Sequence, residues 1–364
     1  MAFGCIPNCF NTRRRRGPNG DRVAAVSDDS CCWGEVESEE EGKGGAGDYD
    51  DCSPARYGWD EIEKLTRNFE CLIGSGGFSN VYLAAGSAAV KVSCSGDYLS
   101  PLFSQELDIL LRLHHRRIVK LLGYSDDKGV FFFKIWSGAL VMEYVPNGTL
   151  QENLHGSGRR PLPWIKRMAI AYQLAEAIDY LHSNVGDVPI VHGDIKASNV
   201  LLDGEQSCKL CDFGSAKMGF SSAVATVGGP RRGKKLVMMG SLGYSDPCYL
   251  RTGLASKKND IYSFGVIVLE LVTGREAFSE EKGEVLAAVI RKRGDEKAGD
   301  LAGLVDPKLG SEFDLGEVEA MFEMARKCVG LAVSVRPSAA EIVESMKASV
   351  ASAFMCGEEG KKKF

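Results

Sequence analysis

The stretch that decides the fold reads IVHGDIKASN over residues 190–199, and it is followed by LCDFG over residues 210–214. Together the two stretches carry a carboxylate, an ammonium, an amide and a second carboxylate: Asp194, Lys196, Asn199 and Asp212. Transfer of a phosphoryl group needs such a set, because an acid must orient the nucleophile, a cation must face the phosphate and oxygen atoms must bind a divalent metal. The pattern therefore predicts phosphoryl-transfer chemistry.

The order D-x-K-x-x-N followed by D-F-G resembles the catalytic and metal-binding loops of protein kinases. The resemblance implies that Asp194 is the catalytic base or orients the nucleophile, and that Lys196 balances charge on the γ-phosphoryl group. It also implies that Asn199 and Asp212 bind Mg²⁺, with Mn²⁺ as an alternative metal. In the competing interpretation Asp194 is a turn residue and Asn199 a helix cap, but each residue then needs a separate explanation.

Residues 73–83 read IGSGGFSNVYL, with glycines between two runs of β-branched or aromatic residues. Such glycines allow a tight hairpin whose backbone N–H groups can approach phosphate oxygens. Alone the signal is weak, and Ser79 stands at the third glycine of G-x-G-x-x-G. The kinase resemblance implies that Phe78 covers the phosphates. The ATP-binding residues expected in this loop are Ile73, Gly74, Ser75, Gly76, Gly77, Phe78, Ser79, Asn80 and Val81.

Residues 88–92, AAVKV, form an apolar strand interrupted by Lys91. In the kinase interpretation Lys91 contacts the α- and β-phosphates of ATP and pairs with an acid on the next helix. Residues 103–113 have apolar residues at helical period, and Glu106 is the acid at the family position. Asp108 is the nearby alternative, but two residues further on it faces another side of the helix. The competing interpretation of Lys91 is an edge-strand lysine that points to water.

Two more strands are expected over residues 130–135 and 139–144, with a turn at residues 137–138. Residues 143–150, EYVPNGTL, resemble the hinge between kinase lobes, where backbone groups contact the adenine edge. The resemblance places Met142 at the inner end of the ATP pocket, where it can also fill the core. It implies backbone contacts to ATP from Glu143 and Val145.

The resemblance of these elements to protein kinases implies an α+β, bilobal protein-kinase fold, with a small β-rich N-lobe that has one key helix and a larger, mainly helical C-lobe. We expect a disordered N-terminal segment over residues 1–53, the kinase domain over 54–350 and a charged tail over 351–364. Within the domain, the N-lobe is expected over about 54–145 and the C-lobe over about 146–350. ATP and Mg²⁺ are the expected cofactors.

Composition excludes several other classes of protein. The chain has 364 residues, 44% of them hydrophobic, and its net charge of −5 gives no reason to expect nucleic-acid binding. The 12 cysteines are scattered, and reduced thiols in the cytosol are the simplest interpretation. No stretch approaches the ~20 apolar residues that span a bilayer.

The first sixteen residues suggest peripheral membrane association. Cys5 and Cys9 precede Arg13–Arg16, and palmitoylated cysteines beside a basic cluster would supply the two signals that stable anchoring usually needs. Each arginine near an anionic leaflet contributes about 1 kcal/mol. Ala2 occupies the position where myristoylation requires glycine. The alternatives are a solvated basic tail with incidental cysteines and a nuclear-import patch.

The resemblance extends over about residues 57–350. WDEIEKLTRNF at residues 59–69 resembles the segment that leads into the kinase domain of plant receptor-like kinases, and the whole pattern resembles a plant receptor-like cytoplasmic kinase of the Pelle type. This implies a serine/threonine protein kinase, as Lys196 and Ser241 also suggest. It further implies protein substrates, a membrane receptor kinase as possible partner, and a cytoplasmic location that includes the inner face of the plasma membrane.

Two positions depart from the family pattern. Gly193 stands where most regulated kinases have an arginine before the catalytic aspartate; this resembles the non-RD subclass and implies that phosphorylation of the activation segment matters less. In GSLGYSDPCYL, residues 240–250, Cys248 replaces a glutamate that in the family pairs with a buried arginine, here Arg336. Either Arg336 finds another acid, or the substrate-binding loop is looser than usual.

The alternative function is therefore a pseudokinase scaffold that binds nucleotide or partners without efficient phosphotransfer. A small-molecule kinase of related fold is disfavoured by the peptide-binding loop. Three supporting roles are also expected. His192 packs under Phe213, Asp260 caps the backbone of the catalytic loop, and the activation segment offers phosphorylation sites at Ser221, Ser222 and Thr226.

Overall fold

The computed structural model describes residues 53–76, 79–85, 87–94, 100–127, 129–131, 134–183, 185–186, 188–219, 240–292, 301 and 303–349. Contacts within the chain separate a first unit, Met1–Asp51, from a second, Cys52–Phe364. The expected anchor residues and the candidate phosphorylation sites lie outside the described residues. So do Gly77 and Phe78 of the glycine loop.

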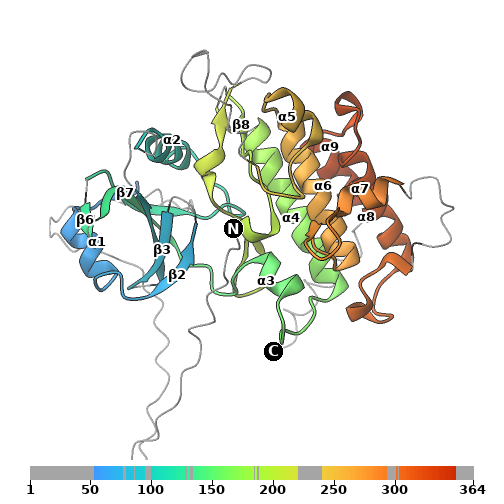
Figure 1. The fold of residues 1–364 in the computed structure, drawn as a ribbon, viewed down its shortest axis with the longest axis horizontal. Helices are drawn as coiled ribbons and strands as arrows, with labels where there is room; N and C mark the ends of the chain where they lie inside the picture. Colours follow the sequence, from blue (N-terminus) through green and yellow to red (C-terminus); the bar gives the residue numbers. More distant parts are fainter. Residues whose placement is uncertain are drawn as a thin grey trace, which may run out of the picture. The chain divides into compact units, whose positions relative to one another are not determined.

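A sheet of seven strands forms the N-lobe (Figure 1). Its order is β1-β5-β7-β4-β3-β2, with β6 paired to β7, and only the β1–β5 pair is parallel. Sequential hairpins place β3 between β2 and β4, so that Val81 lies opposite Lys91. The strands are β1 (Ala55–Arg56), β2 (Leu72–Ser75), β3 (Ser79–Ala84), β4 (Ala88–Cys94), β5 (Leu121–Ser125), β6 (Gly129–Phe131) and β7 (Lys134–Glu143).

Helix α1 (Trp59–Leu65) packs on this sheet through its apolar face. Its first turn is stabilised by the Glu61 carboxylate, which accepts the Gly58 N–H at 2.7 Å. Ile62 is fully buried in a small core with Phe69 and residues of β3, β4 and β7. The chain leaves the helix through a left-handed turn at residues 67–69, where the Thr66 hydroxyl accepts the Phe69 N–H.

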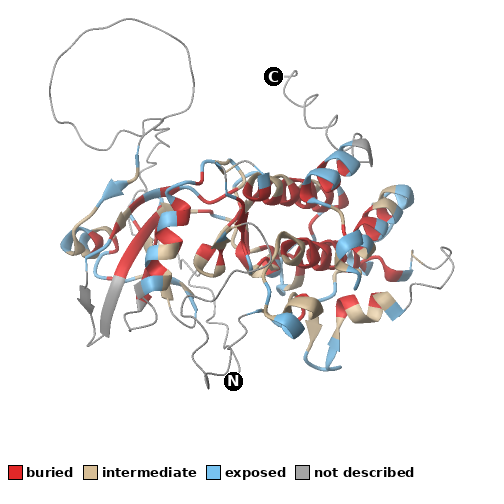
Figure 2. Cartoon of the chain, turned by 90° about the horizontal axis from the view of Figure 1, so that it is seen from above, coloured by how far each residue is buried: buried red, intermediate tan, exposed pale blue. Residues whose placement is uncertain are grey.

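Helices make up most of the C-lobe, and α4, α6, α8 and α9 lie side by side in Figure 1. Helix α6 is buried without interruption from Asp260 to Thr273, which explains its nearly continuous apolar sequence. Figure 2 shows buried positions concentrated in the inner helices and along the sheet. The helices are α2 (Ser100–Leu110) of the N-lobe, and α3 (Leu150–His155), α4 (Trp164–Ser183), α5 (Pro247–Thr252), α6 (Lys257–Thr273), α7 (Leu286–Lys292), α8 (Leu315–Cys328) and α9 (Ala339–Ser349).

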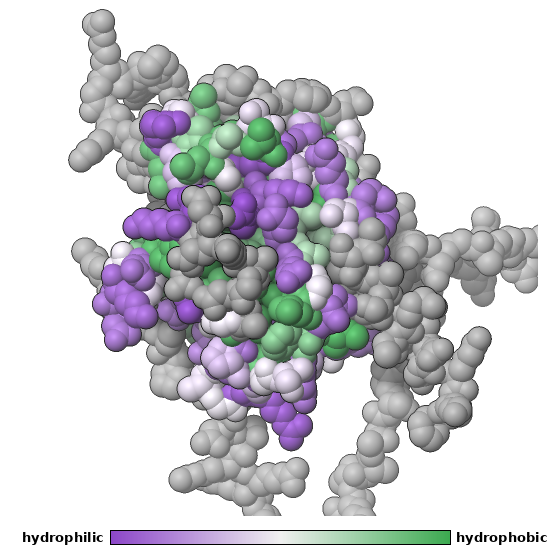
Figure 3. All heavy atoms as spheres, turned by 90° about the vertical axis from the view of Figure 1, so that its right-hand side faces the viewer, coloured by the Kyte–Doolittle hydropathy of each residue, from purple (hydrophilic) through white to green (hydrophobic). Residues whose placement is uncertain are grey.

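Short strands and 3₁₀ helices lie in the connections between these helices. The chain order puts a strand on each side of both D-x-K-x-x-N and D-F-G, so the polar residues sit on loops held at both ends. On the outer face of the helical lobe, polar and apolar side chains are interspersed (Figure 3). The short elements are β8 (Ile190–Val191), η1 (Ala197–Asn199), β9 (Val200–Leu202), β10 (Cys208–Leu210), η2 (Phe213–Ser215), β11 (Lys217–Met218), β12 (Phe278–Ser279), β13 (Glu284–Val285), η4 (Pro307–Leu309) and η5 (Val333–Val335).

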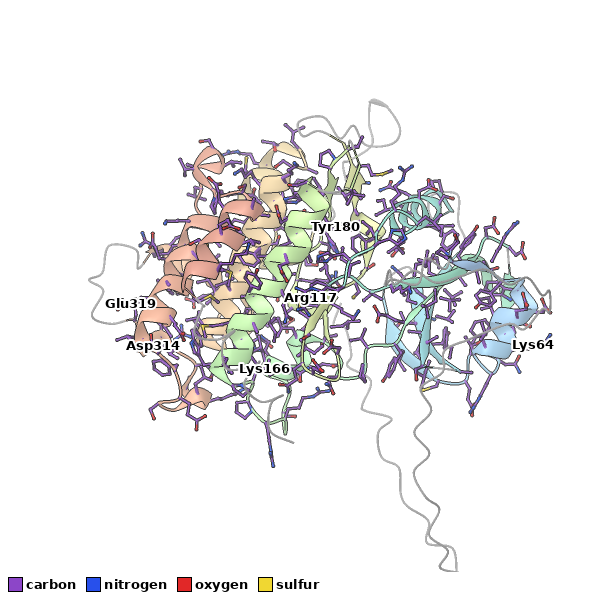
Figure 4. All side chains as sticks on the ribbon, turned by 180° about the vertical axis from the view of Figure 1, so that it is seen from behind. Lys64, Arg117, Lys166, Tyr180, Asp314 and Glu319 are labelled. Carbon is purple, nitrogen blue, oxygen red and sulfur yellow. The ribbon has the colours of Figure 1, made fainter. Side chains whose placement is uncertain are left out.

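The segment after α2 connects the two lobes. The His114 N–H donates to the Tyr180 hydroxyl of α4 at 2.9 Å, and the His115 ring stacks on Tyr180 with centroids 4.7 Å apart. Ile118 forms a parallel bridge with Leu210 of β10. Figure 4, seen from behind, labels Tyr180 and the neighbouring Arg117. These contacts fix the end of α2 close to the D-F-G stretch.

The predicted α+β kinase fold is confirmed, with a β-rich lobe and a helical lobe. The prediction of a turn at residues 137–138 is wrong, because β7 runs unbroken from Lys134 to Glu143. The register of β4 against β7 shifts between Ser93 and Cys94, and Gly138 has φ +155°. These two features indicate a bulge rather than a turn. A side chain at position 138 would collide with the Phe103 ring of α2. Of the described helices, none combines the length and apolarity needed to cross a bilayer.

Replacing Ile62 by alanine should lower the free energy of unfolding by about 2–5 kcal/mol, because it leaves a cavity between α1 and the sheet. Urea unfolding followed by circular dichroism measures the change. Ile165→Ala is the matched control, since Ile165 is 39% exposed on α4 and its truncation should cost far less. Equal losses from the two variants would contradict the packing of α1 as part of the N-lobe core.

Candidate active site

A buried ammonium joins two carboxylates near the D-F-G stretch. Lys91 Nζ of β4 lies 2.7 and 3.0 Å from the two carboxylate oxygens of Glu106 on α2, and 2.7 Å from Asp212 Oδ1. Lys91 is 8% exposed and Glu106 4%. The predicted pairing of Lys91 with Glu106, rather than with Asp108, is confirmed. The three side chains tie the sheet, α2 and the D-F-G loop to one another.

The charge of Lys91 controls the ionisation of Asp212. Burial would raise the pKa of Asp212, but the charge of Lys91 and its hydrogen bond outweigh burial and lower this pKa to about 2. The pKa of Lys91 is raised in turn: burial opposes its charge, yet Glu106 and Asp212 more than compensate. Asp212 has φ +64°, an uncommon conformation for a residue other than glycine. Asp212 is therefore a fixed, ionised carboxylate at neutral pH.

A second cluster surrounds Asp194. Lys196 Nζ donates to Asp194 Oδ2 at 2.7 Å and to Ser241 Oγ at 3.0 Å, while the Ser241 hydroxyl donates to Asp194 Oδ1 at 2.7 Å. The Asn199 amide donates to the backbone oxygen of Asp194 at 2.9 Å. The Asp194 carboxylate thus accepts a hydroxyl group from Ser241 beside the Lys196 ammonium.

Asp260, at the start of α6, holds the loop that carries Asp194. Its carboxylate oxygens accept the backbone N–H groups of His192 and Gly193, each at 2.9 Å, and Oδ2 also lies 2.9 Å from His182 Nε2. The predicted capping by Asp260 is confirmed. Gly193 has φ +80°, and a Cβ there would come within 2.9 Å of the Ser215 oxygen, so this position favours glycine.

His192 is structural, as expected. Its ring centroid lies 4.8 Å from that of Phe213, and its Nε2 lies 3.1 Å from the Cys211 oxygen. His192 is fully buried and packs against the D-F-G loop through these two contacts.

Arg336 pairs with another acid, which decides between the two outcomes that Cys248 left open. Its Nη1 and Nη2 donate to Asp246 Oδ2 and Oδ1 at 2.6 and 3.0 Å. Both side chains are buried, with exposed fractions of 0% and 1%. The loss of the glutamate at position 248 therefore leaves no uncompensated buried charge on Arg336.

Of the expected ATP-binding residues of the glycine loop, Ile73 to Ser75 lie on β2 and Ser79 to Val81 on β3. Gly74 and Ser75 pair with Val81 and Asn80 across the hairpin, and the Gly76 N–H donates to the Ser79 oxygen at 2.8 Å. That hydrogen bond closes the loop whose tip lies outside the described residues. Ile73 precedes it on β2 and is 40% exposed.

The hinge residues lie at the end of β7 and just after it. Met142 pairs with Ala89 of β4 and is half-buried, and Val145 is buried. Glu143 Oε1 accepts the Lys120 N–H at 2.8 Å and the Lys209 ammonium at 2.7 Å. The Glu143 side chain therefore fixes the hinge to β10, which leaves backbone groups as the candidates for contact with a nucleotide.

Sequence reasoning missed three features of this region. Lys209 was overlooked, although it is the one charge in the short strand CKL that leads into D-F-G. Asp246 was overlooked, although it is the nearest carboxylate to Cys248. Cys208 and Cys211 form a C-x-x-C pair that the description of scattered cysteines did not take into account. Burial raises the pKa of both thiols to about 12, so they stay protonated and are poor metal ligands.

Residues 68–346 match the protein kinase domain. The chain belongs to the protein kinase family. A probable receptor-like protein kinase of Arabidopsis thaliana is 48% identical over 301 residues, which cover 79% of this chain and 86% of that protein. A salt tolerance receptor-like cytoplasmic kinase of Oryza sativa subsp. japonica is 43% identical over 356 residues, which cover 95% of this chain and 92% of that protein.

A third relative, a probable LRR receptor-like serine/threonine-protein kinase of Arabidopsis thaliana, is 36% identical over 311 residues. The match covers 81% of this chain but 33% of that larger protein. The family and these receptor-like relatives show that this kinase phosphorylates serine or threonine in proteins and uses ATP with a divalent metal. The prediction of a plant receptor-like cytoplasmic kinase is confirmed to this extent: similar plant proteins are named receptor-like and receptor-like cytoplasmic kinases.

Replacing Lys91 by methionine should raise the pKa of Asp212 from about 2 towards its ordinary 3.8, because burial still raises this pKa while the two largest lowering contributions, the charge and the hydrogen bond of Lys91, are lost. In the wild type, the stability that Asp212 contributes is present above pH 3.8 and is lost as the pH falls towards 2. Unfolding midpoints in urea should therefore fall less steeply over this range in Lys91→Met. NMR titration of the Asp212 carboxyl carbon measures the pKa directly.

Asp60→Asn is the control for this titration, since Asp60 is an exposed acid on α1. It should leave the pKa of Asp212 at about 2. A pKa for Asp212 that stayed near 2 in Lys91→Met would contradict the assigned cause.

Proposed function

We propose that this kinase transfers the γ-phosphoryl group of Mg-ATP to serine or threonine hydroxyls of proteins by way of Asp194 and Lys196. The observation that carries the proposal is the hydrogen bond from the Ser241 hydroxyl to Asp194 Oδ1, at 2.7 Å, beside the Lys196 ammonium. An acceptor hydroxyl that replaced Ser241 on Asp194 would be oriented in the same way. Asp194 would then accept its proton as the oxygen attacks.

Lys196 supports this step through its position. Its ammonium lies 2.7 Å from Asp194 and 3.0 Å from Ser241, so it would face negative charge that develops on the transferred group. When bound, ATP supplies the phosphoryl group, and its divalent ion neutralises phosphate charge. The Asn199 amide donates to the backbone oxygen of Asp194, and this hydrogen bond keeps the Asn199 side chain next to Asp194.

The residues present fit a nucleotide with a divalent metal. Asp212 is ionised and Asn199 offers an amide oxygen, and both are ligand types that Mg²⁺ and Mn²⁺ accept. Within the described part of the chain, no group of three or more His, Cys, Asp or Glu could hold a metal by itself. A metal here would depend on phosphate oxygens as well, as Mg²⁺ usually does. Lys91, held by Glu106, would bind the α- and β-phosphates.

The adenine end would be bound by the hinge and the glycine loop. We assign backbone contacts to Glu143 and Val145, with Met142 at the inner wall of the pocket. The phosphates would be covered by the loop from Ile73 to Val81. The support is the hairpin register, which places Val81 opposite Lys91. The absence of an arginine at Gly193 favours the non-RD subclass, in which phosphorylation of the activation segment matters less.

Asp194→Asn in the full chain should lower kcat for phosphorylation of a protein acceptor by about 10²–10⁴-fold, because the base is lost while the fold is kept. Lys91→Met should also abolish transfer. Incorporation of labelled phosphate onto serine and threonine measures both, and Asp60→Asn is the control that should keep wild-type activity. A wild type as inactive as Asp194→Asn, while ATP still bound, would support the pseudokinase alternative instead.

We also propose that the kinase works at the cytoplasmic face of the plasma membrane and cooperates with a membrane receptor kinase. The support is Cys5 and Cys9 followed by Arg13–Arg16, which together provide acylation sites and a basic cluster. A relative is named a receptor-like cytoplasmic kinase, which is consistent with this arrangement.

Replacing Cys5 and Cys9 by serine should move the kinase from the membrane fraction to the supernatant of plant-cell extracts, because a basic cluster alone binds membranes weakly. Fractionation followed by immunoblotting measures the shift. Cys71→Ser is the matched control, a partly exposed cysteine of the folded domain that should not alter the distribution. If wild type and double variant distribute alike, the proposed anchor is wrong.

A further inference from the structure

A buried arginine holds the substrate-binding loop through an acid that differs from the one in the family pattern. Cys248 stands where related kinases carry the glutamate partner of this arginine. Arg336 instead makes a two-pronged contact with Asp246, at 2.6 and 3.0 Å. Such a fork matches the planar guanidinium and is stronger than a single hydrogen bond. The acid that pairs with Arg336 is therefore Asp246, two residues before position 248.

Asp246 is the centre of a wider network. Its Oδ1 accepts the Cys248 N–H at 2.8 Å, which caps α5, and its Oδ2 accepts the Asn259 amide at 3.1 Å. Arg336 Nε donates to the Gly330 oxygen at 2.8 Å, and its guanidinium carbon lies 5.2 Å from the centre of the Tyr262 ring. One carboxylate therefore connects the loop, both helices that follow it, and the segment before α9.

The same carboxylate adjoins the turn that contacts the catalytic cluster. The N–H groups of Tyr244 and Ser245 donate to the Ser241 oxygen at 3.1 and 3.2 Å, and Asp246 follows directly. Ser241 in turn donates its hydroxyl to Asp194. Asp194, Ser241 and Asp246 also line one small cavity. A shift of Asp246 would therefore be passed through a short, hydrogen-bonded turn to the hydroxyl that rests on Asp194.

We propose that Asp246 is the positioning residue of the substrate loop and acts through Arg336 in place of the glutamate missing at position 248. This rests on the proposed function of Asp194 in phosphoryl transfer. Asp246 does not contact the reacting atoms. It sets the place of the 241–245 turn against Asp194, and hence the fit of the acceptor protein, while the contacts of Lys91 and Asp212 remain independent of it.

The test uses the full chain with casein as acceptor and four variants: Asp246→Asn, Cys248→Glu, the two combined, and Asp314→Asn. Asparagine at 246 keeps the helix cap and removes the charge that Arg336 needs. Asp314→Asn is the matched control, because Asp314 caps α8 through the Glu317 N–H and is remote in the fold (Figure 4). Initial rates at varied casein and varied ATP give kcat and the two KM values, and calorimetry gives Tm.

Asp246→Asn should lower kcat/KM for casein at least tenfold and change KM for ATP less than threefold. Cys248→Glu alone should stay within twofold of wild type, because Arg336 is already paired. Glutamate at 248 restores the family's acid, so the combined variant should recover at least half of the lost kcat/KM and of the lost Tm. Asp314→Asn should leave kcat/KM for casein within twofold.

Three results would overturn the proposal: a combined variant no better than Asp246→Asn, a several-fold gain from Cys248→Glu alone, or equal changes in both KM values. If Asp246→Asn does not fold, the combined variant decides, and its failure to yield active protein contradicts the proposal. A wild-type chain that transfers no phosphate contradicts the proposed function and its catalytic consequence. Recovery of Tm in the combined variant would then still identify Asp246 as the partner of Arg336.

Discussion

The Lys91 ammonium, shared between Glu106 and Asp212, is the interaction on which the candidate site depends. A lysine this deeply buried is tolerated because it has two carboxylate partners. The partners come from α2 and from the D-F-G loop, so one charge joins two neighbouring N-lobe elements to a loop 121 residues further along the chain. The same charge keeps Asp212 ionised, and electrostatics and architecture therefore cannot be changed separately at this point.

Buried carboxylates organise the helical lobe in a similar way. Asp260 accepts the backbone N–H groups of His192 and Gly193, Asp246 pairs with Arg336, and Asp306 pairs with Arg167 of α4. Glu270 accepts the Tyr244 hydroxyl at 2.7 Å and lies 3.2 Å from His155 Nε2. Each acid contacts groups from more than one segment, and these include backbone N–H groups outside the regular hydrogen bonding of helices and strands, such as those of His192, Gly193 and Ala277.

The apolar core supplies the rigid frame for these contacts. Helix α6 is buried along almost its whole length and presents Asp260 near one end and Glu270 near the other. Through these two acids, one buried helix contacts both the loop at His192 and Gly193 and the turn at Tyr244. Within this frame Arg336 is paired with Asp246, although Cys248 stands at the glutamate position of the family pattern.

Sequence by itself determined the kinase fold, the pairing of Lys91 with Glu106, and the polar residues of the two loops. These follow from the resemblance of its short motifs to those of protein kinases, and helical periodicity supports the position of Glu106. Tertiary structure alone decided that β7 continues through Gly138, that Glu143 is held by Lys209, and that Arg336 pairs with Asp246. The physical reason is that the two ion pairs join segments 66 and 90 residues apart, and the continuation of β7 depends on a backbone bulge opposite a neighbouring strand, so that no local pattern encodes any of the three.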